Sequence, residues 1–195
     1  MTGGCFASVR AVGKYAIEQA RRDRLQRRTS TTGAVNTLVF ETPLLGHVGA
    51  LASAAAVAVV ETLLGMSLDR ELVSRGLSAV SSEGRLALSA LGGDVLLLDD
   101  SYNANQASYR SALATAAELA DEGGRRLVVV AGEMRELGGE SPLAHEELGR
   151  EVALSGASLL IAVAGDACRI AAGAREEGME ALFVEDVAAA AELAR

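Results

Sequence analysis

The stretch VLLLDDSYNANQASYRSAL, residues 95–113, places a strand beside a helix with a very polar turn between them. The apolar run at its start is typical of a buried strand, and an alanine-rich pattern of helical period begins at Gln106. Asn105 stands where a helix N-cap is expected, because its side-chain oxygen can accept from the first backbone N–H groups of a helix. That cap explains one polar residue and leaves two aspartates, a serine, a tyrosine and a second asparagine without a structural reason.

Downstream of this stretch the chain alternates strands with helices. Apolar strands are expected at 127–131, 159–164 and 181–185. Helices are expected after Ser141, Asp166 and Asp186, each of which can act as an N-cap. The alternation predicts an α/β fold with a Rossmann-like open sheet of mostly parallel strands.

Such sheets bind their ligands beyond the carboxyl ends of the strands. Three polar loops are therefore expected to lie together at that edge: DDSYNAN at 99–105, GEMRELGGES at 132–141 and GDA at 165–167. An aspartate there, Asp99 or Asp100, can accept from both hydroxyl groups of a ribose, and an asparagine amide can bind a purine edge. The residues alone leave two interpretations open, a nucleotide-type site or a polar strand-to-helix loop.

The upstream part of the chain is less clearly patterned. A strand is expected at 37–42, and 14–20 fits either a strand or a short helix. The basic stretch 21–33 is interpreted as a solvated hairpin loop, with a phosphate or nucleic-acid patch as the alternative. The apolar residues 48–64 predict a helix buried nearly all round, followed by a short helix capped by Ser67.

A change of pattern follows these helices. The small polar residues 78–85 indicate a domain boundary. Beyond it, the apolar segments 86–91 and 95–100 are separated by Gly92 and Gly93 and predict a hairpin.

Composition limits the functions open to the chain. The 195 residues carry a net charge of −8, which disfavours binding to nucleic acid. Cys5 and Cys168 lie far apart without metal-ligand spacing, and the N-terminus lacks the pattern of a signal peptide. The longest apolar run is interrupted by Ser53, Glu61 and Thr62, so no insertion into a membrane is expected. We expect a cytoplasmic protein.

The second loop carries carboxylates, Glu133, Glu136 and Glu140, that precede His145 in the sequence. A metal site and a solvated loop entering a helix are both consistent with them, and the loop is the simpler interpretation. His47 is interpreted as a helix-entry residue. The sequence contains neither G-x-x-x-x-G-K followed by Ser or Thr nor G-x-G-x-x-G after a strand, so it offers no backbone cradle for a triphosphate.

Three segments in order, LLLDDSYNAN, GEMRELG and HEELG, together resemble the C-terminal domain of the Mur ligases. They are most similar to the branch that adds D-alanyl-D-alanine to UDP-N-acetylmuramoyl-tripeptide, and the other Mur ligases and the folylpolyglutamate synthetases are the alternative within the superfamily. The resemblance implies that residues 1–80 are the end of a central ATPase domain. It implies that residues 81–195 form the C-terminal domain without its last strand.

The resemblance also implies an activity and its site. Members of the family are ATP-dependent ligases that act through an acyl phosphate in peptidoglycan synthesis. Arg85 matches the arginine that contacts ATP, Asp100 matches the aspartate that contacts the ribose, and Asn103 is expected as a further nucleotide contact. Substrate contacts are expected from three more residues of the same turn, Ser101, Tyr102 and Asn105.

The family's phosphate-binding loop and its Mg²⁺ ligands are expected upstream of Met1, so this chain is predicted to contain no catalytic residue, to hold no metal and to be inactive alone. It also departs from the family pattern. GHVGAL at 46–51 lacks two asparagines, Gln106 replaces a proline, Glu133 replaces an aspartate, and a Ser-Glu pair replaces a proline before Gly84. These departures keep two other hypotheses open: a non-catalytic module that binds a nucleotide or a partner, and an unrelated α/β nucleotide-binding domain.

Overall fold

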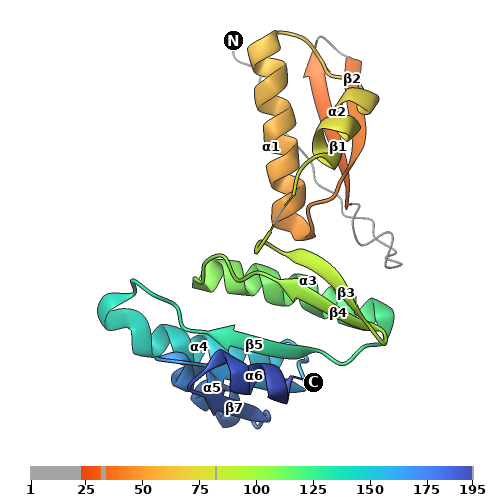
Figure 1. Ribbon diagram of the computed structural model, residues 1–195. Helices are drawn as coiled ribbons and strands as arrows, with labels where there is room; N and C mark the ends of the chain where they lie inside the picture. The colour runs from red at the N-terminus through yellow and green to blue at the C-terminus, as the bar shows by residue number, and fades with distance from the viewer. Residues whose placement is uncertain (1–22, 32–33, 82, 195) are drawn as a thin grey trace. The chain divides into compact units, whose positions relative to one another are not determined.

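The computed structural model describes residues 23–31, 34–81 and 83–194 (Figure 1). The chain divides into two compact units, Met1–Asp99 and Asp100–Arg195, and each is described by itself. The domain boundary expected within the small polar stretch 78–85, between residues 80 and 81, stays a prediction.

The first unit begins with an antiparallel hairpin. Strand β1 (Asp23–Thr31) pairs with β2 (Ala34–Thr42) in an uninterrupted register from Asp23 opposite Thr42 to Thr31 opposite Ala34. The prediction of a loop over 21–33 is therefore wrong for residues 23–31, because their backbone groups find partners along the whole of β2. The segment 14–20 lies outside the described residues.

Two helices complete the core of this unit, α1 (Gly46–Leu64) and α2 (Arg70–Ser78). Phe40 of β2 is fully buried and packs in one cluster with side chains of both helices, namely Ala50, Ala54, Val57, Val73 and Leu77. A buried polar pair joins β2 to α1. The Thr42 hydroxyl donates to Ser53 over 2.7 Å, and Ser53 donates to the carbonyl of Gly49 over 2.9 Å, so both hydroxyls are satisfied.

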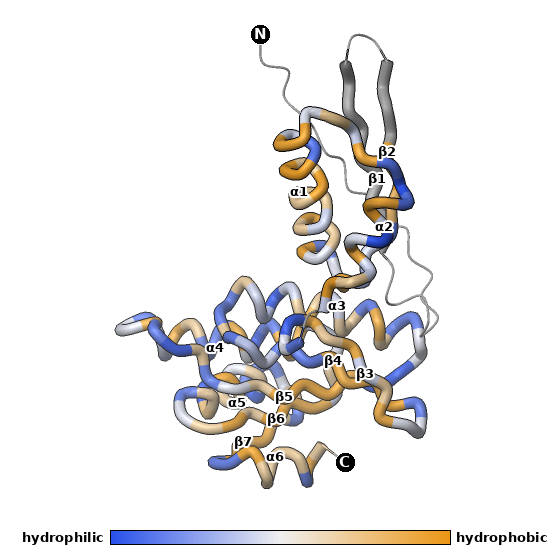
Figure 2. The backbone as a smooth tube through the Cα atoms, turned by 45° about the horizontal axis from the view of Figure 1, so that its top comes forward, coloured by the Kyte–Doolittle hydropathy of each residue, from blue (hydrophilic) through white to orange (hydrophobic). Residues whose placement is uncertain are grey.

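Helix α1 is apolar on both sides but buried on only one. Its buried residues are Gly49, Ala50, Ser53, Ala54 and Val57. The opposite side exposes the large apolar side chains of Val48, Leu51, Val59 and Leu63, and beyond Val57 the packed side is exposed as well, at Val60 and Leu64. The expectation of a helix buried nearly all round is wrong, because in the described part of the unit only one side of α1 packs against neighbours. Figure 2 shows apolar colours along most of the helix, interrupted by a hydrophilic stretch near its C-terminal end.

The same helix is long and apolar enough to cross a membrane by length and composition. The helix has 19 residues and so is longer than the interrupted apolar run at 48–64. Core helices of folded proteins satisfy the same criterion, so this finding alone does not assign α1 to a membrane.

Two turns of the first unit follow local chemistry. Helix α2 is capped by Asp69, which accepts from Leu72 N over 2.8 Å, and not by Ser67 as predicted. The predicted hairpin is confirmed as β3 (Ala87–Gly92) paired antiparallel with β4 (Val95–Asp99). Gly93 and Asp94 at its tip both have positive φ angles, as a two-residue type I′ turn requires.

The second unit alternates helices and strands as predicted. Its elements are α3 (Gln106–Gly123), β5 (Val128–Gly132), the 3-10 turn η1 (Gly138–Glu140), α4 (Ser141–Leu154), β6 (Leu159–Val163), α5 (Ala167–Glu176), β7 (Ala181–Val184) and α6 (Val187–Leu193). The strands form a parallel sheet in the order β5-β6-β7. The α/β class and the parallel sheet are thus confirmed.

Helices cover both faces of this sheet. Successive side chains of β6 point to opposite faces, and the two sets pack against different helices. Leu160 and Ala162 join the larger core with residues of α3, α4 and α5. Ile161 and Val163 face the other way and pack with Ala190 of α6. These four side chains of β6 are buried and Leu159, its first residue, is partly buried, which accounts for a strand apolar at every position.

Two glycines set the distance between α4 and α5. A Cβ added at Gly149 would lie 2.0 Å from the carbonyl oxygen of Ile170, and one at Gly173 would lie 2.1 Å from the carbonyl oxygen of Glu146. The two helix backbones therefore touch where no side chain intervenes. Any larger residue at either position must push the helices apart.

Gly149→Ala is expected to lower the free energy of unfolding by about 1–3 kcal/mol through this overpacking. Chemical unfolding followed by circular dichroism measures the change. Gly139→Ala is the matched control in the same unit, because an added Cβ there meets nothing within 4 Å and its φ is not positive. Equal stability of the two variants would contradict the close contact.

Candidate functional site

The turn that follows β4 ends in the predicted helix cap. Asn105 accepts from Ser108 N over 2.9 Å, and the Ser108 hydroxyl accepts from Asn105 N over 3.2 Å, so the two residues form a reciprocal capping box. Asn103 accepts from Ala104 N over 2.9 Å. The side-chain oxygens of both asparagines are thus used to shape the turn, which leaves their amide N–H groups for a ligand.

Three more residues expected at a ligand lie in this turn, and a fourth, Arg85, lies elsewhere. Asp100 is partly buried, whereas Ser101 and Tyr102 are exposed, and Tyr102 keeps 69% of its surface. Arg85 belongs to the first unit, where it is exposed in the bend before β3. All of these side chains are accessible from solvent.

Tyr109 ties the start of α3 to the end of β5. Its hydroxyl donates to the carbonyl oxygen of Gly132 over 2.7 Å. Burial raises the pKa of Tyr109 to about 12, and the nearby carboxylate of Asp100 adds to the increase. The phenol therefore remains a hydrogen-bond donor at neutral pH. Sequence analysis missed this role, because Tyr109 fits the apolar stripe of α3 and only its helical position next to the polar turn could have indicated it.

The second and third loops meet at the same edge of the sheet. Glu133, just beyond β5, accepts from the backbone N–H of Asp166 over 3.3 Å and from Arg135 over 3.0 Å. Gly165 lies under this carboxylate: its φ is +51°, and a Cβ there would approach Glu133 Oε2 to 1.9 Å. With Tyr109 bound to Gly132, the prediction that the three loops share one edge is confirmed for residues 100–105, 132–141 and 165–167.

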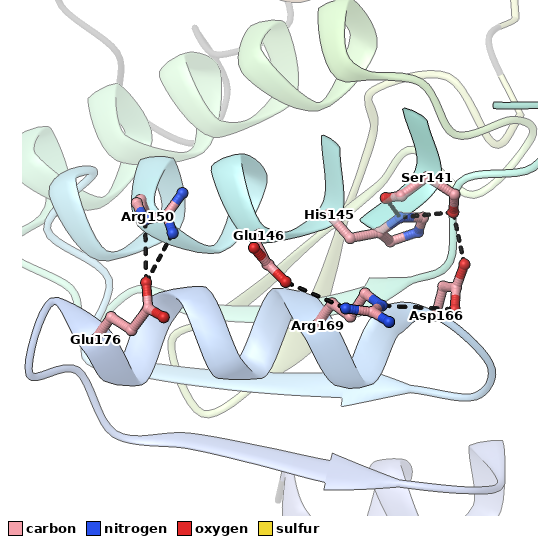
Figure 3. Close-up of polar contacts among 7 residues, drawn as sticks. All are labelled: Ser141, His145, Glu146, Arg150, Asp166, Arg169 and Glu176. Atoms are coloured by element: carbon pink, nitrogen blue, oxygen red, sulfur yellow. Dashed lines mark hydrogen bonds and ion pairs between the residues drawn. The ribbon is translucent and has the colours of Figure 1, made fainter. Parts of the chain in front are cut away.

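A buried histidine stands behind this edge (Figure 3). His145 of α4 is fully buried, and its Nε2 accepts from the backbone N–H of Met134 over 2.9 Å. Its Nδ1 lies 2.7 Å from the carbonyl oxygen of Ser141. The Ser141 hydroxyl in turn donates to Asp166 over 2.6 Å. Sequence analysis placed His145 near the carboxylates of the loop but did not find these partners.

The prediction that Ser141 caps α4 is wrong. The preceding η1 turn makes Glu140 the cap position, with no side-chain cap bond there. The hydroxyl of Ser141 is therefore available to bridge to Asp166. Asp166 lies at the cap position of α5, yet it makes no side-chain cap bond to that helix.

The alternative of a metal site in the second loop finds no support in the geometry. The part of the chain that the structure describes holds no cluster of three histidine, cysteine or acidic side chains suited to a metal ion. Both ring nitrogens of His145 are engaged in hydrogen bonds within the protein.

The turn at 100–105 presents one carboxylate, an exposed aromatic ring and several amide and hydroxyl groups. Carboxylates accept from neighbouring hydroxyl groups, and amide N–H groups donate to ring nitrogens or carbonyls. The turn is therefore suited to binding a polar ligand with a diol.

Residues 84–195 match the family model described as Mur ligase, glutamate ligase domain. This chain belongs to the Mur ligase family. Among curated Mur ligases, the UDP-N-acetylmuramoyl-tripeptide–D-alanyl-D-alanine ligase of Escherichia coli strain K12 is 37% identical over 133 residues. Those residues are 68% of this chain and 27% of the relative, so the chain spans about a quarter of that Mur ligase's length.

Solved Mur ligase structures share the fold. MurF from Acinetobacter baumannii superimposes with a TM-score of 0.67 and 28% identity over 88% of this chain and 34% of that one. MurF ligase from Thermotoga maritima, solved in complex with ADP, superimposes with a TM-score of 0.56 at 20% identity, over 84% of this chain and 40% of that one. The second likeness shows the fold alone.

Tyr109→Phe is expected to remove a phenol titration with a midpoint at about pH 12. Between pH 10 and pH 12 the folded protein holds a proton that the unfolded chain has released, so stability falls as the pH rises through this window, by about 3 kcal/mol in total. The variant should lose that dependence. Ultraviolet titration and unfolding at several pH values measure both effects, with Tyr102→Phe as the exposed control; identical curves for Tyr109→Phe and the parent protein would contradict the assignment.

Proposed function

We propose that this chain is part of an ATP-dependent ligase that adds D-alanyl-D-alanine to UDP-N-acetylmuramoyl-tripeptide in peptidoglycan synthesis in the cytoplasm. The observation that carries the proposal is the family match over residues 84–195, which includes the polar turn at the edge of the sheet. The name and 37% identity of the Escherichia coli relative support the choice of branch within the family.

Asp100 is proposed to bind the ribose of ATP. Its carboxylate can accept from two adjacent hydroxyl groups, and it lies near the buried phenol of Tyr109, so the surrounding edge is held in place. Asn103 offers its amide N–H groups to the base, since its oxygen is used by Ala104 N. The residues present therefore fit a nucleoside.

Arg85, which belongs to the first unit, is proposed as a contact for the phosphates of ATP. A guanidinium is a permanent cation whose several donors suit a phosphate group. The exposure of Arg85 is consistent with a ligand contact. When bound, ATP would supply the phosphoryl group that activates the substrate carboxylate.

Ser101, Tyr102 and Asn105 are proposed as contacts for the peptide substrates. The hydroxyl and amide groups can bind a peptide or a carboxylate, and the exposed ring of Tyr102 offers apolar surface for an alanine methyl group. We assign no Mg²⁺ ligand to this chain, because no segment of it matches the family's phosphate loop or metal ligands.

A chimera tests the proposed activity. Residues 84–195 would replace the corresponding segment of the Escherichia coli ligase, and product formation from UDP-N-acetylmuramoyl-tripeptide, ATP and D-alanyl-D-alanine would be measured. We expect turnover with D-alanyl-D-alanine and none with glutamate. A folded chimera that accepts glutamate would indicate another branch of the superfamily. A folded chimera that binds ATP without turnover would indicate the non-catalytic module that the missing asparagines of 46–51 favour.

Asp100→Ala in that chimera is expected to weaken ATP binding by about tenfold, the effect of losing roughly one to two hydrogen bonds to a charged group. Asp121→Ala is the matched control, an exposed carboxylate near the other end of α3. Calorimetric titration with ATP measures both. Unchanged affinity in Asp100→Ala would remove Asp100 from the site.

The 195-residue chain alone is expected to hydrolyse no ATP, because its sequence provides no phosphate-binding loop. Release of inorganic phosphate from the purified chain measures this. A rate above that of buffer, abolished by Asp100→Ala, would show that the chain is catalytic by itself.

A further inference from the structure

We infer that His145 is a positioning residue, which holds the loop after β5 at the edge of the sheet as a neutral imidazole protonated on Nδ1. The inference concerns the fold of this chain. Only its expected effect on nucleotide binding rests on the proposed function.

The hydrogen-bond partners fix the form of the ring. The backbone N–H of Met134 can only donate, so Nε2, 2.9 Å away, must be an acceptor without a proton. The carbonyl oxygen of Ser141 can only accept, so Nδ1, 2.7 Å away, must carry the proton. Neither the other neutral tautomer nor the doubly protonated ring satisfies both partners.

The ring completes a closed chain of hydrogen bonds, here called the circuit, between the loop at 132–141 and the loop at 165–167. From Met134 the circuit passes through His145 to Ser141, and the hydroxyl of Ser141 donates to Asp166 over 2.6 Å. The backbone N–H of Asp166 donates back to Glu133, the residue before Met134. Figure 3 shows His145 and Ser141 at the beginning of α4, with Asp166 of the neighbouring loop next to Ser141.

Charged groups surround this circuit without contacting the ring. Asp166 and Arg169 of the third loop and α5 form an ion pair at 4.0 Å, and Arg169 also pairs with Glu146 of α4 at 3.2 Å. In the second loop, Arg135 pairs with Glu133 at 3.0 Å. These partly exposed pairs frame the edge, whereas the fully buried imidazole joins the backbone segments directly.

This arrangement excludes a chemical role for His145. A general base or a metal ligand needs a ring nitrogen with an unused lone pair and access to substrate. The only acceptor nitrogen of His145 is used by Met134, and the side chain is fully buried. Its contribution is to fix Glu133 and Gly132, and Gly132 in turn receives the hydroxyl of Tyr109 beside Asp100.

The nitrogen-15 spectrum of the labelled 195-residue chain tests the inference without any substitution. The chain contains two histidines, so the exposed His47 is an internal reference. We expect His145 to show a protonated Nδ1 and an unprotonated Nε2 at neutral pH. A protonated Nε2 would overturn the inference.

Two substitutions separate the two hydrogen bonds. His145→Gln can place an oxygen near the position of Nε2 and keep an acceptor for Met134, whereas His145→Asn can keep only a donor near the position of Nδ1. We expect amide exchange of Met134 to be about tenfold faster in His145→Asn than in His145→Gln, the effect of one buried hydrogen bond. His47→Asn and His47→Gln are the matched controls and should leave this rate unchanged. Equal exchange rates in the two His145 variants would overturn the inference.

Addition of ADP to the labelled chains separates this inference from the proposed function. We expect smaller shifts of the Asp100 and Asn103 signals in His145→Asn than in the parent chain. Absence of ADP shifts in the parent chain, with the expected tautomer and exchange rates, would count against the nucleotide site and leave the positioning role standing. Normal ADP shifts in His145→Asn would overturn the positioning role at the edge.

Discussion

The close crossing of α4 and α5 is the constraint on which the second unit depends. Gly149 lies against the backbone of Ile170, and Gly173 lies against that of Glu146. Because both helices follow strands of one parallel sheet, they run in the same direction and begin at the same edge. The crossing therefore brings Ser141 and Asp166, at the two helix starts, within hydrogen-bond distance and sets the geometry of the candidate site.

Charges on α4 divide between its neighbours. Glu147 and Glu151 contact Gln106 and Arg110 of α3, whereas Glu146 and Arg150 pair with Arg169 and Glu176 of α5 (Figure 3). Exposed pairs of this kind contribute only about 0–1 kcal/mol each. Their main effect is to set the rotation of α4, because the two pairs of residues face different neighbouring helices. The stability of the unit comes instead from the buried side chains that the helices share with the sheet.

The edge combines a rigid base with an exposed turn. Tyr109 and His145 bind backbone groups on either side of Glu133, at Gly132 and Met134. The turn at 100–105 is held by its own asparagines and presents its other polar groups to solvent. Such a division suits a ligand site, because the supporting contacts are made before any ligand arrives.

Local sequence patterns were enough to predict the α/β class, the order of strands and helices in the second unit, the Asn105 cap and the polar edge, because these depend on local periodicity and on residues a few positions apart. They did not determine that α1 is buried on one side only, that residues 23–31 form a strand, or that Ser141 binds Asp166. Those features depend on which surfaces meet. Partners 11 to 33 residues apart, such as His145 with Met134 or Glu133 with Asp166, leave no periodic signal, so only the packed structure decided them.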